Sequence, residues 1–178
     1  MSKYKILAIT LARGGSKGIK NKNIKKISGK PLIFYTIKEA LKSNLISDYI
    51  VSTDSQDISN ISKKLGAKVP FLRPKKYSTD KASSVSALKH AVIWMENEHN
   101  IKYDFVIELM CTNPLKTKSD IESVIKKLIK TKADSVIAVN KLEDHHPRRI
   151  KKIVNDKIVD FCLNEKKESR RQDLKPDA

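Results

Sequence analysis

Short apolar runs alternate with stretches of helical periodicity along most of this chain, and few folds accommodate that order. Five runs have the length and apolar content of buried strands: residues 4–12, 49–53, 68–72, 104–109 and 135–140. Strands that alternate with amphipathic helices form βαβ units. We therefore predict an α/β fold in which helices cover both faces of a mostly parallel sheet.

Four amphipathic helices are expected between or after these strands, because apolar residues recur three or four positions apart. Gly66 is expected to end the second helix. Ser119 and Glu122 stand at capping-box spacing, so we expect them to begin the fourth. The apolar faces are formed by Ile33, Ile37, Ala40 and Leu41; by Ile58, Ile61 and Leu65; by Val85, Leu88, Val92 and Met95; and by Ile121, Val124, Ile125, Leu128 and Ile129.

The alternation ends after Asn140. Residues 150–154 and 157–161 flank Asn155-Asp156, which predicts a β-hairpin. We expect this arm, at residues 145–165, to serve association into a homodimer. The 178 residues, with 39% apolar, suffice for one core, so we expect a single domain over residues 1–178.

The net charge of +17 favours anionic partners such as nucleotides, acidic sugars or nucleic acid. Many lysines fall on the polar faces of the expected helices, where solvent alone satisfies them. Residues 1–30 differ, because they hold nine basic residues and no acidic one around a glycine-bearing segment. No apolar run approaches the length of a membrane span, so we expect a cytoplasmic protein with no membrane partner. Cys111 and Cys162 have neither metal-site nor disulfide spacing.

The segment Leu-Ala-Arg-Gly-Gly-Ser-Lys-Gly at residues 11–18 directly follows the first expected strand. Ligands of parallel α/β sheets bind beyond the carboxyl ends of strands, where glycines let backbone N–H groups approach phosphate oxygens. Arg13 adds a bidentate donor and Lys22 a point charge. The segment matches neither the P-loop nor the dinucleotide-binding fingerprint, which argues against an ATPase or a dehydrogenase. For glycines alone, a flexible loop remains the alternative.

The motifs follow one another in the order found in a known family: ARGGSKG, KNKN and GKPL at residues 12–32, STD at 52–54, LRP at 72–74, STDKASS at 78–84, HHP at 145–147 and RRQ at 170–172. The chain resembles the acylneuraminate cytidylyltransferases, the CMP-sialic acid synthetases and their relatives for legionaminic and pseudaminic acids. The resemblance implies a three-layer αβα, Rossmann-like fold of the nucleotide-diphospho-sugar transferase type. It also implies transfer of a cytidylyl group from CTP to an acidic nine-carbon sugar, with release of pyrophosphate.

The resemblance also implies roles for individual residues. Arg13 and Lys22 are the expected catalytic groups, because cations stabilise the charge that develops on the phosphoryl oxygens and the departing pyrophosphate. Helix capping is the alternative role for Asp80, Ser83 and Ser84. The expected nucleotide-binding residues are Arg13, Gly14, Gly15, Ser16, Lys22, Asn23, Arg73, Asp80, Ser83 and Ser84.

The expected sugar-binding residues lie near the end of the chain. They are His145 and His146, for which solvated surface histidines are the alternative, and Arg171 and Gln172. Arginine suits the carboxylate of an acidic sugar. Without the resemblance, these last two residues would be read as a solvated tail.

The chain departs from the family pattern at two points. Met110 and Asn113 stand where the family has glutamine and serine, which makes a different sugar plausible. The family's Asp-x-Asp pair for Mg²⁺ would lie beyond residue 178, so Mg²⁺ is expected as the cofactor but its ligands are expected outside this chain. A non-catalytic nucleotide-binding fragment and a basic nucleic-acid-binding protein remain alternatives. We expect no nucleic-acid partner, because no aromatic stacking platform accompanies the charge.

Overall fold

The computed structural model describes residues 4–16, 18–79, 82–139 and 151–160. Contacts divide the chain into two units, Met1–Asp134 and Ser135–Ala178, which are described separately. The expectation of a single domain over residues 1–178 stays a prediction. No helix in the described part of the chain has the length and apolar content to cross a lipid bilayer.

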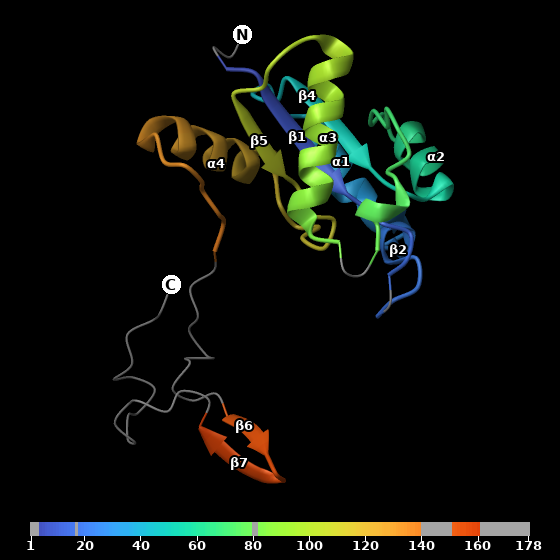
Figure 1. Cartoon of the computed structure of the whole chain (residues 1–178), viewed down its shortest axis with the longest axis vertical. Coiled ribbons are helices and arrows are strands. Elements are labelled where there is room, and N and C mark those ends of the chain that lie inside the picture. Colours follow the sequence, from blue (N-terminus) through green and yellow to red (C-terminus); the bar gives the residue numbers. More distant parts are fainter. Residues whose placement is uncertain (1–3, 17, 80–81, 140–150, 161–178) are drawn as a thin grey trace. The chain divides into compact units, whose positions relative to one another are not determined.

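The first unit is built on a parallel sheet with the strand order β4-β1-β5. Figure 1 shows the three strands running in the same direction. The central strand is fully buried from Ile6 to Ile9, as expected for a strand covered on both faces. The bounds are β1 Ile6–Leu11, β4 Asp48–Ser52 and β5 Phe105–Glu108.

The expected strand at residues 68–72 is present only as two isolated parallel bridges along β4. These bridges join Ile50 to Lys68 and Thr53 to Leu72. Pro70 lies between them, and a proline has no N–H to continue the ladder of hydrogen bonds. The segment therefore follows the edge of the sheet without forming a continuous strand.

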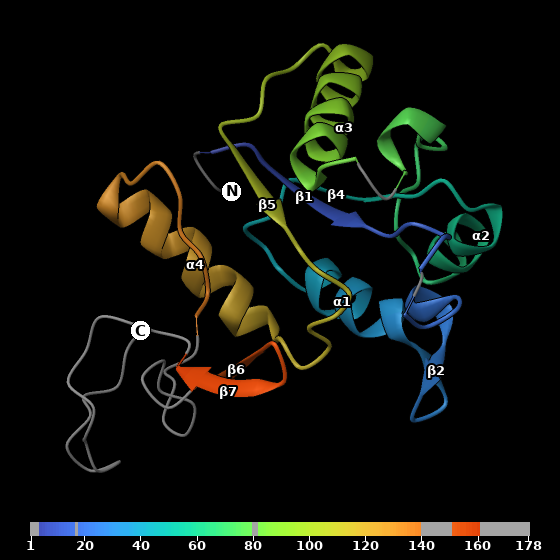
Figure 2. The ribbon, with the colours of Figure 1, turned by 60° about the horizontal axis from the view of Figure 1, so that its bottom comes forward.

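Helices cover both faces of the sheet, which gives the expected three-layer αβα arrangement (Figure 2). On one face, Ile6 and Ala8 of β1 join a core that includes residues of α1, α2 and α4. On the other face, Leu7 and Ile9 join a core with residues of α3. The bounds are α1 Leu32–Leu41, α2 Gln56–Lys64, α3 Ser84–His99 and α4 Lys118–Thr131.

Helix ends follow local chemistry. Gly66 has a positive φ of 90° just after α2, in the left-handed region where glycine is favoured, so the expected stop is confirmed.

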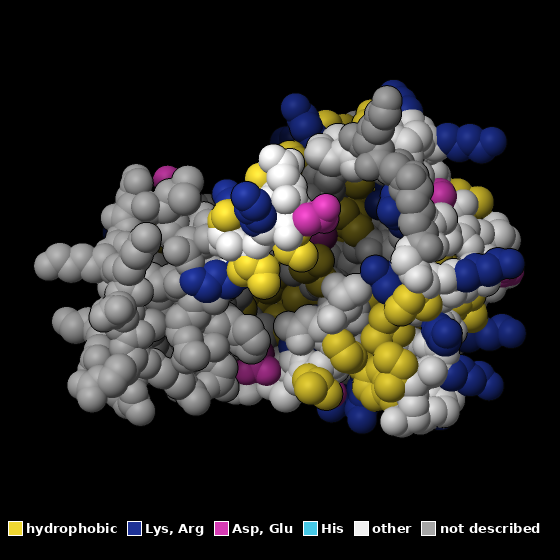
Figure 3. Space-filling model, turned by 90° about the horizontal axis from the view of Figure 1, so that it is seen from below, with side chains coloured by type: hydrophobic (Ala, Val, Ile, Leu, Met, Phe, Trp, Pro, Cys, Tyr) yellow, Lys and Arg dark blue, Asp and Glu magenta, His cyan; other side chains and the backbone are white. Residues whose placement is uncertain are grey.

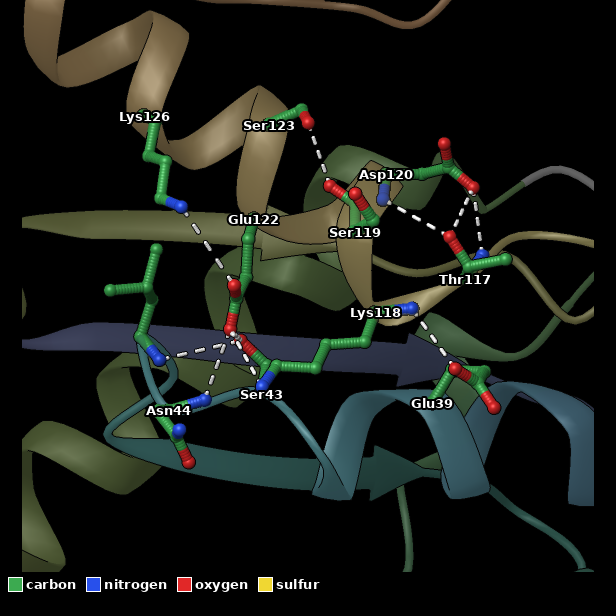
Figure 4. Close-up of polar contacts among 11 residues, drawn as sticks. Glu39, Ser43, Asn44, Thr117, Lys118, Ser119, Asp120, Glu122, Ser123 and Lys126 are labelled. Atoms are coloured by element: carbon green, nitrogen blue, oxygen red, sulfur yellow. Dashed lines mark hydrogen bonds and ion pairs between the residues drawn. The ribbon is translucent and has the colours of Figure 1, made fainter.

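The expected capping box of α4 is wrong by two residues. The N-cap residue of α4 is Thr117, which has an extended backbone. Its side chain and that of Asp120 form the capping box (Figure 4). Ser119 and Glu122 lie inside the helix, and Glu122 accepts hydrogen bonds from residues 43 and 44 instead.

Four short elements complete the first unit. They lie in the connections that follow the carboxyl ends of the strands. They are the 3₁₀ turns η1 Lys22–Ile24 and η2 Lys75–Tyr77 and the paired strands β2 Lys26–Ile27 and β3 Lys30–Pro31.

The second unit contains the expected hairpin, formed by β6 Lys151–Val154 and β7 Lys157–Asp160. Asn155 and Asp156 have φ values of 49° and 58°, as a tight two-residue turn requires. The strand expected at 135–140 is wrong for the described residues 135–139, which form no strand. A parallel strand needs a neighbour to supply its ladder, and no described strand pairs with this segment.

Candidate functional site

A cleft of about 670 Å³ opens at the carboxyl ends of the strands in the first unit. Figure 3 shows that this end of the molecule is hollowed and that dark blue lysine and arginine side chains lie beside the hollow. Its position agrees with the rule for ligand sites in parallel α/β sheets. It is lined by Leu11, Arg13, Ser16, Gly18, Ile19, Lys22, Asn23, Arg73, Tyr77, Ser78, Thr79, Ala82, Ser83, Ser84, Ala87, Glu108, Met110, Cys111 and Thr112.

The strand order divides this lining into three parts. Because β1 is central, the loop that follows it supplies the middle, including Arg13 and Lys22. The segment that follows α2 along β4 supplies one side, including Arg73. The loop after β5 supplies the opposite side, residues 110–112. A ligand with a central polyphosphate therefore has room for one organic group on each side.

The loop after β1 is held by hydrogen bonds and by close packing. The backbone N of Gly14 donates to Asp54 Oδ1 at 2.9 Å. A Cβ on Gly14 would lie 3.0 Å from the Cβ of Ser55, so only glycine fits without a shift. Nδ2 of the buried Asn23 donates to the carbonyl oxygen of Arg13 at 3.1 Å. The loop is therefore positioned before any ligand binds.

Arg73 brings a buried cation to the cleft. The residue is only 5% exposed, and its Nε donates to Ser78 Oγ at 3.0 Å. Its Nη2 lies 4.0 Å from Asp54 Oδ1, which is a long ion pair. Burial lowers the pKa of the guanidinium, the carboxylate of Asp54 opposes that shift, and the charge of Arg13 adds to it. A desolvated cation with one distant carboxylate favours a ligand that brings acceptor oxygens.

The first turn of α3 forms another part of the lining. The Ser83 hydroxyl caps this helix by accepting from the backbone N of Ser86 at 3.1 Å, so the capping alternative is correct for Ser83. Ser83 and Ser84 also line the cleft. The amino end of a helix favours negative charge. The start of α3 therefore acts in the same direction as the arginine and lysine side chains of the cleft.

The β5 side of the cleft has a different chemistry. Burial raises the pKa of the Glu108 carboxyl. Burial also raises the pKa of the Cys111 thiol to about 11, so the thiol is neutral at physiological pH and is not an activated nucleophile. Met110 presents an exposed apolar side chain beside them. This side offers one carboxyl group and apolar surface.

The structure brings together many of the residues that the sequence singled out. Arg13, Ser16, Lys22, Asn23, Arg73, Ser83 and Ser84 all line the cleft. Gly14 and Gly15 belong to the same loop but do not line it. The remaining candidates lie outside the described residues: Asp80, His145, His146, Arg171 and Gln172.

Several residues of the site were not expected. Asp54 joins the glycine loop to Arg73, and its place at the end of a strand in Ser-Thr-Asp was a usable signal. Tyr77 and Glu108 also line the cleft, but no motif in the sequence pointed to them. Ser78 lines it too and opens the motif at residues 78–84, although no role was expected for it.

The described residues do not form a metal site. No group of three or more His, Cys, Asp or Glu side chains among them is arranged to hold a metal ion. The carboxylate among the described lining residues is that of Glu108. We therefore assign no step of the reaction to a metal held by these residues.

Comparison with known proteins identifies the family. Residues 7–165 match the family described as Cytidylyltransferase. The chain belongs to this cytidylyltransferase family. It is therefore related to enzymes that transfer nucleotidyl groups, as the resemblance of its motifs implied.

Named relatives cover different shares of the chain. The pseudaminic acid cytidylyltransferase of Campylobacter jejuni strain 81-176 is 37% identical over 171 residues, which are 96% of this chain and 72% of that protein. The CMP-N,N'-diacetyllegionaminic acid synthase of Legionella pneumophila is 35% identical over 76% of this chain and 58% of its own length. The N-acylneuraminate cytidylyltransferase of Escherichia coli O18:K1:H7 is 39% identical over 68% of this chain, but only 28% of its own length.

Solved structures support the fold of the cytidylyltransferase chain. A CMP:2-keto-3-deoxy-manno-octonic acid synthetase complexed with CTP has a TM-score of 0.59 at 22% identity, over 72% of this chain and 49% of that one. The 4-diphosphocytidyl-2C-methyl-D-erythritol synthase of Anaerococcus prevotii has a TM-score of 0.56 at 17% identity, over 90% and 65%. At these identities the likeness concerns the three-layer architecture alone.

Proposed function

We propose that this cytidylyltransferase transfers CMP from CTP to an acidic nine-carbon sugar and releases pyrophosphate. The observation that carries the proposal is the cleft itself, where the glycine loop after β1 and Lys22 lie beside the buried Arg73. The names of the relatives, which concern pseudaminic, legionaminic and acylneuraminic acids, support an acceptor of this class.

In the proposed reaction the triphosphate of CTP lies over the loop after β1. The anomeric hydroxyl oxygen of the sugar attacks the α-phosphorus and passes its proton to water, while the bond from that phosphorus to the bridging oxygen of the β-phosphate breaks. Negative charge grows on the phosphoryl oxygens and on the leaving pyrophosphate. Arg13 and Lys22 stabilise this charge, and preorganised cations of this kind lower the barrier.

The two sides of the cleft suit the two organic groups. On the β4 side, Arg73 and Ser78 offer donors and an acceptor to the cytosine ring. Ser83, which also lines the cleft, is the proposed contact of the ribose. The sugar then occupies the β5 side, beside residues 110–112. His145, His146, Arg171 and Gln172 belong to the proposal as further sugar contacts, on the resemblance of their motifs alone.

We further propose that the β6–β7 hairpin contributes to a homodimer. Ile153 and Ile158 face each other across the two strands, and each is 74% exposed. An isolated hairpin is marginally stable in water, so an apolar pair at its centre favours a partner. Replacing both isoleucines with threonine should convert dimer to monomer in sedimentation experiments. A monomeric parent protein would refute this part.

Mg²⁺ and a cytoplasmic location complete the proposal. Phosphoryl transfer commonly uses Mg²⁺ to neutralise phosphate charge. Turnover should therefore stop when EDTA is added and return when Mg²⁺ is supplied in excess.

The decisive experiment measures pyrophosphate release from CTP in the presence of single acidic nine-carbon sugars, with ATP, GTP and UTP as matched controls. We expect release with CTP and one or more sugars, and none without an acceptor. Binding of CTP with no release across the whole panel would refute catalysis and leave a nucleotide-binding module. Equal binding of all four nucleotides would refute the proposed role of Arg73 and Ser78.

A further inference from the structure

Lys116 makes a convergent set of hydrogen bonds under the loop that follows β5. Its Nζ donates to Thr36 Oγ1 at 2.8 Å, to the Met110 carbonyl oxygen at 2.7 Å and to the Asn113 carbonyl oxygen at 2.6 Å. An ammonium group has three protons, so these acceptors use all of them. Lys116 itself does not line the cleft, whereas Met110 does.

The acceptor on α1 is rigidly placed. Thr36 is fully buried in α1, and the apolar side chains of this helix pack in the core of the first unit. Lys116 therefore connects a fixed point of the core to two carbonyl groups of a loop that has no helix or strand of its own. Hydrogen bonds from a charged donor are the stronger kind, so this connection has a large effect on where the loop lies.

The same face of α1 holds the start of α4. The backbone N of Lys118 donates to Glu39 Oε2 at 2.9 Å. One turn later, Glu122 Oε1 accepts from Ser43 Oγ at 3.2 Å (Figure 4). Thr36 and Glu39 are three residues apart, which is the spacing of neighbours on one helical face. Ser43 lies just beyond the end of α1 at Leu41. Among these contacts, the one between Lys116 and Thr36 lies nearest to the cleft.

The loop that Lys116 holds forms the β5 side of the cleft. Residues 110–112 line it, and Cys111 is only 3% exposed beneath the surface. Without Lys116, two loop carbonyl groups lose their charged donor. The Met110 oxygen then keeps two longer hydrogen bonds from neutral donors, from Thr36 Oγ1 at 3.5 Å and from Asn113 N at 3.3 Å. A shift of this wall changes the space opposite the nucleotide side.

We propose that Lys116 is a positioning residue that fixes the wall formed by residues 110–112 and so determines how the sugar acceptor fits. The role of this wall toward the sugar rests on the proposed function, whereas the contact between Lys116 and the loop does not. CTP lies toward the loop after β1 and toward Arg73, away from this wall. Loss of Lys116 should therefore affect the two substrates unequally.

The first test compares Lys116→Met with the parent protein in the pyrophosphate-release assay. Methionine keeps much of the length of the side chain but donates no hydrogen bond. We expect the KM for the sugar to rise about tenfold, as the loss of hydrogen bonds to a charged group implies, while the KM for CTP stays within about twofold. Lys116→Arg, which keeps the charge with a different donor geometry, should give an intermediate KM for the sugar.

The matched control is Lys126→Met. Lys126 lies on α4, where its Nζ is 3.9 Å from Glu122 Oε2 and its side chain is largely exposed. This variant removes one lysine charge from the same contact region without touching the loop, so both KM values should stay at the parent level. Equal rises in the two KM values for Lys116→Met, or no rise at all, would overturn the proposal.

The second test needs no turnover, and it separates a failure of this proposal from a failure of the proposed function. In a Cys162→Ser background, the rate at which a disulfide reagent modifies Cys111 reports how closely the loop is held. We expect the rate to rise about tenfold or more in Lys116→Met and to be unchanged in Lys126→Met. Equal rates in Lys116→Met and the parent would overturn the positioning role even if the sugar acceptor proved to be of another class.

Discussion

Replacing Gly14 with alanine should displace the loop after β1, and so lower the stability of the protein and its affinity for CTP. The added Cβ would lie 3.0 Å from the Cβ of Ser55, whereas comfortable carbon contacts lie at about 3.5–4.0 Å. Because Ser55 caps α2, the loop is the part that has to move. That movement also stretches the 2.9 Å hydrogen bond from the Gly14 backbone N to Asp54 Oδ1.

The expected magnitude follows from these two contacts. Overpacking by a methyl group costs about 1–3 kcal/mol, and a weakened hydrogen bond to a carboxylate adds up to about 1.5–3 kcal/mol. We expect the free energy of unfolding, measured by urea denaturation, to fall by about 1–6 kcal/mol. The lower end corresponds to overpacking alone and the upper end to overpacking with complete loss of the hydrogen bond. The Kd for CTP, measured by calorimetry, should rise by about ten- to a hundredfold, since each tenfold corresponds to about 1.4 kcal/mol.

Gly15→Ala is the matched control for the Gly14 variant. No atom lies within 4 Å of a Cβ placed on Gly15, so its free energy of unfolding should equal that of the parent. The same free energy of unfolding and the same Kd for CTP in the two alanine variants would refute this prediction. That result would mean that the close approach of Gly14 to Ser55 does not constrain the loop after β1.

Three further predictions concern other groups of the cleft. Lys22→Met should lower kcat by about 10²–10³-fold, as the loss of one preorganised donor does elsewhere, with a smaller change in the Kd for CTP; an unchanged kcat would exclude its catalytic role. Arg73→Met should raise the Kd for CTP about tenfold or more, and Arg73→Lys should restore only part of the affinity, because lysine lacks the planar fork; parent affinity in Arg73→Met would contradict this. In a Cys162→Ser background, alkylation of Cys111 should stay slow at neutral pH and accelerate toward pH of about 11, the raised pKa of its thiol. Burial favours the neutral thiol, so the contribution of Cys111 to the free energy of unfolding is fully present below the pKa of the thiol in the unfolded chain, about 8.5. This contribution is lost as the pH rises through the pKa of the thiol in the folded protein. A free energy of unfolding that increases over this pH interval would contradict the raised pKa.

Much of the fold could be predicted from periodicity alone. The buried run of β1 and most of the apolar face of each helix follow from hydrophobic spacing, because burial on one or both faces selects those residues. The expectation is wrong for Val85 and Leu41, which are 70% and 50% exposed. In α3 the buried positions are Ala87, Ala91 and Met95. The failures have local causes. Pro70 interrupts a run that otherwise looks like a strand, and residues 135–139 are apolar but have no paired neighbour among the described residues.

The site could be predicted only in part. Arg13 and Lys22 were recognisable, because a basic, glycine-bearing loop directly after the first strand has few other interpretations. The burial of Arg73 was not, because it depends on the segment after α2 returning along β4, where the Arg73 backbone N donates to the Thr53 carbonyl oxygen at 2.7 Å. The hydrogen bond from Lys116 to Thr36 could not be predicted either, since it joins residues that lie 80 positions apart.

The shared carboxylate of Asp54 has a consequence for how this enzyme can change its nucleotide preference. Asp54 holds the backbone of Gly14 and also faces the guanidinium of Arg73. In the proposed binding mode, a substitution at Arg73 that accommodates another base also disturbs the loop that is proposed to hold the phosphates. Substitutions at Arg73 and Gly14 should therefore not be additive in a double-mutant cycle. Redesign of base selectivity would have to change Arg73 and Asp54 together.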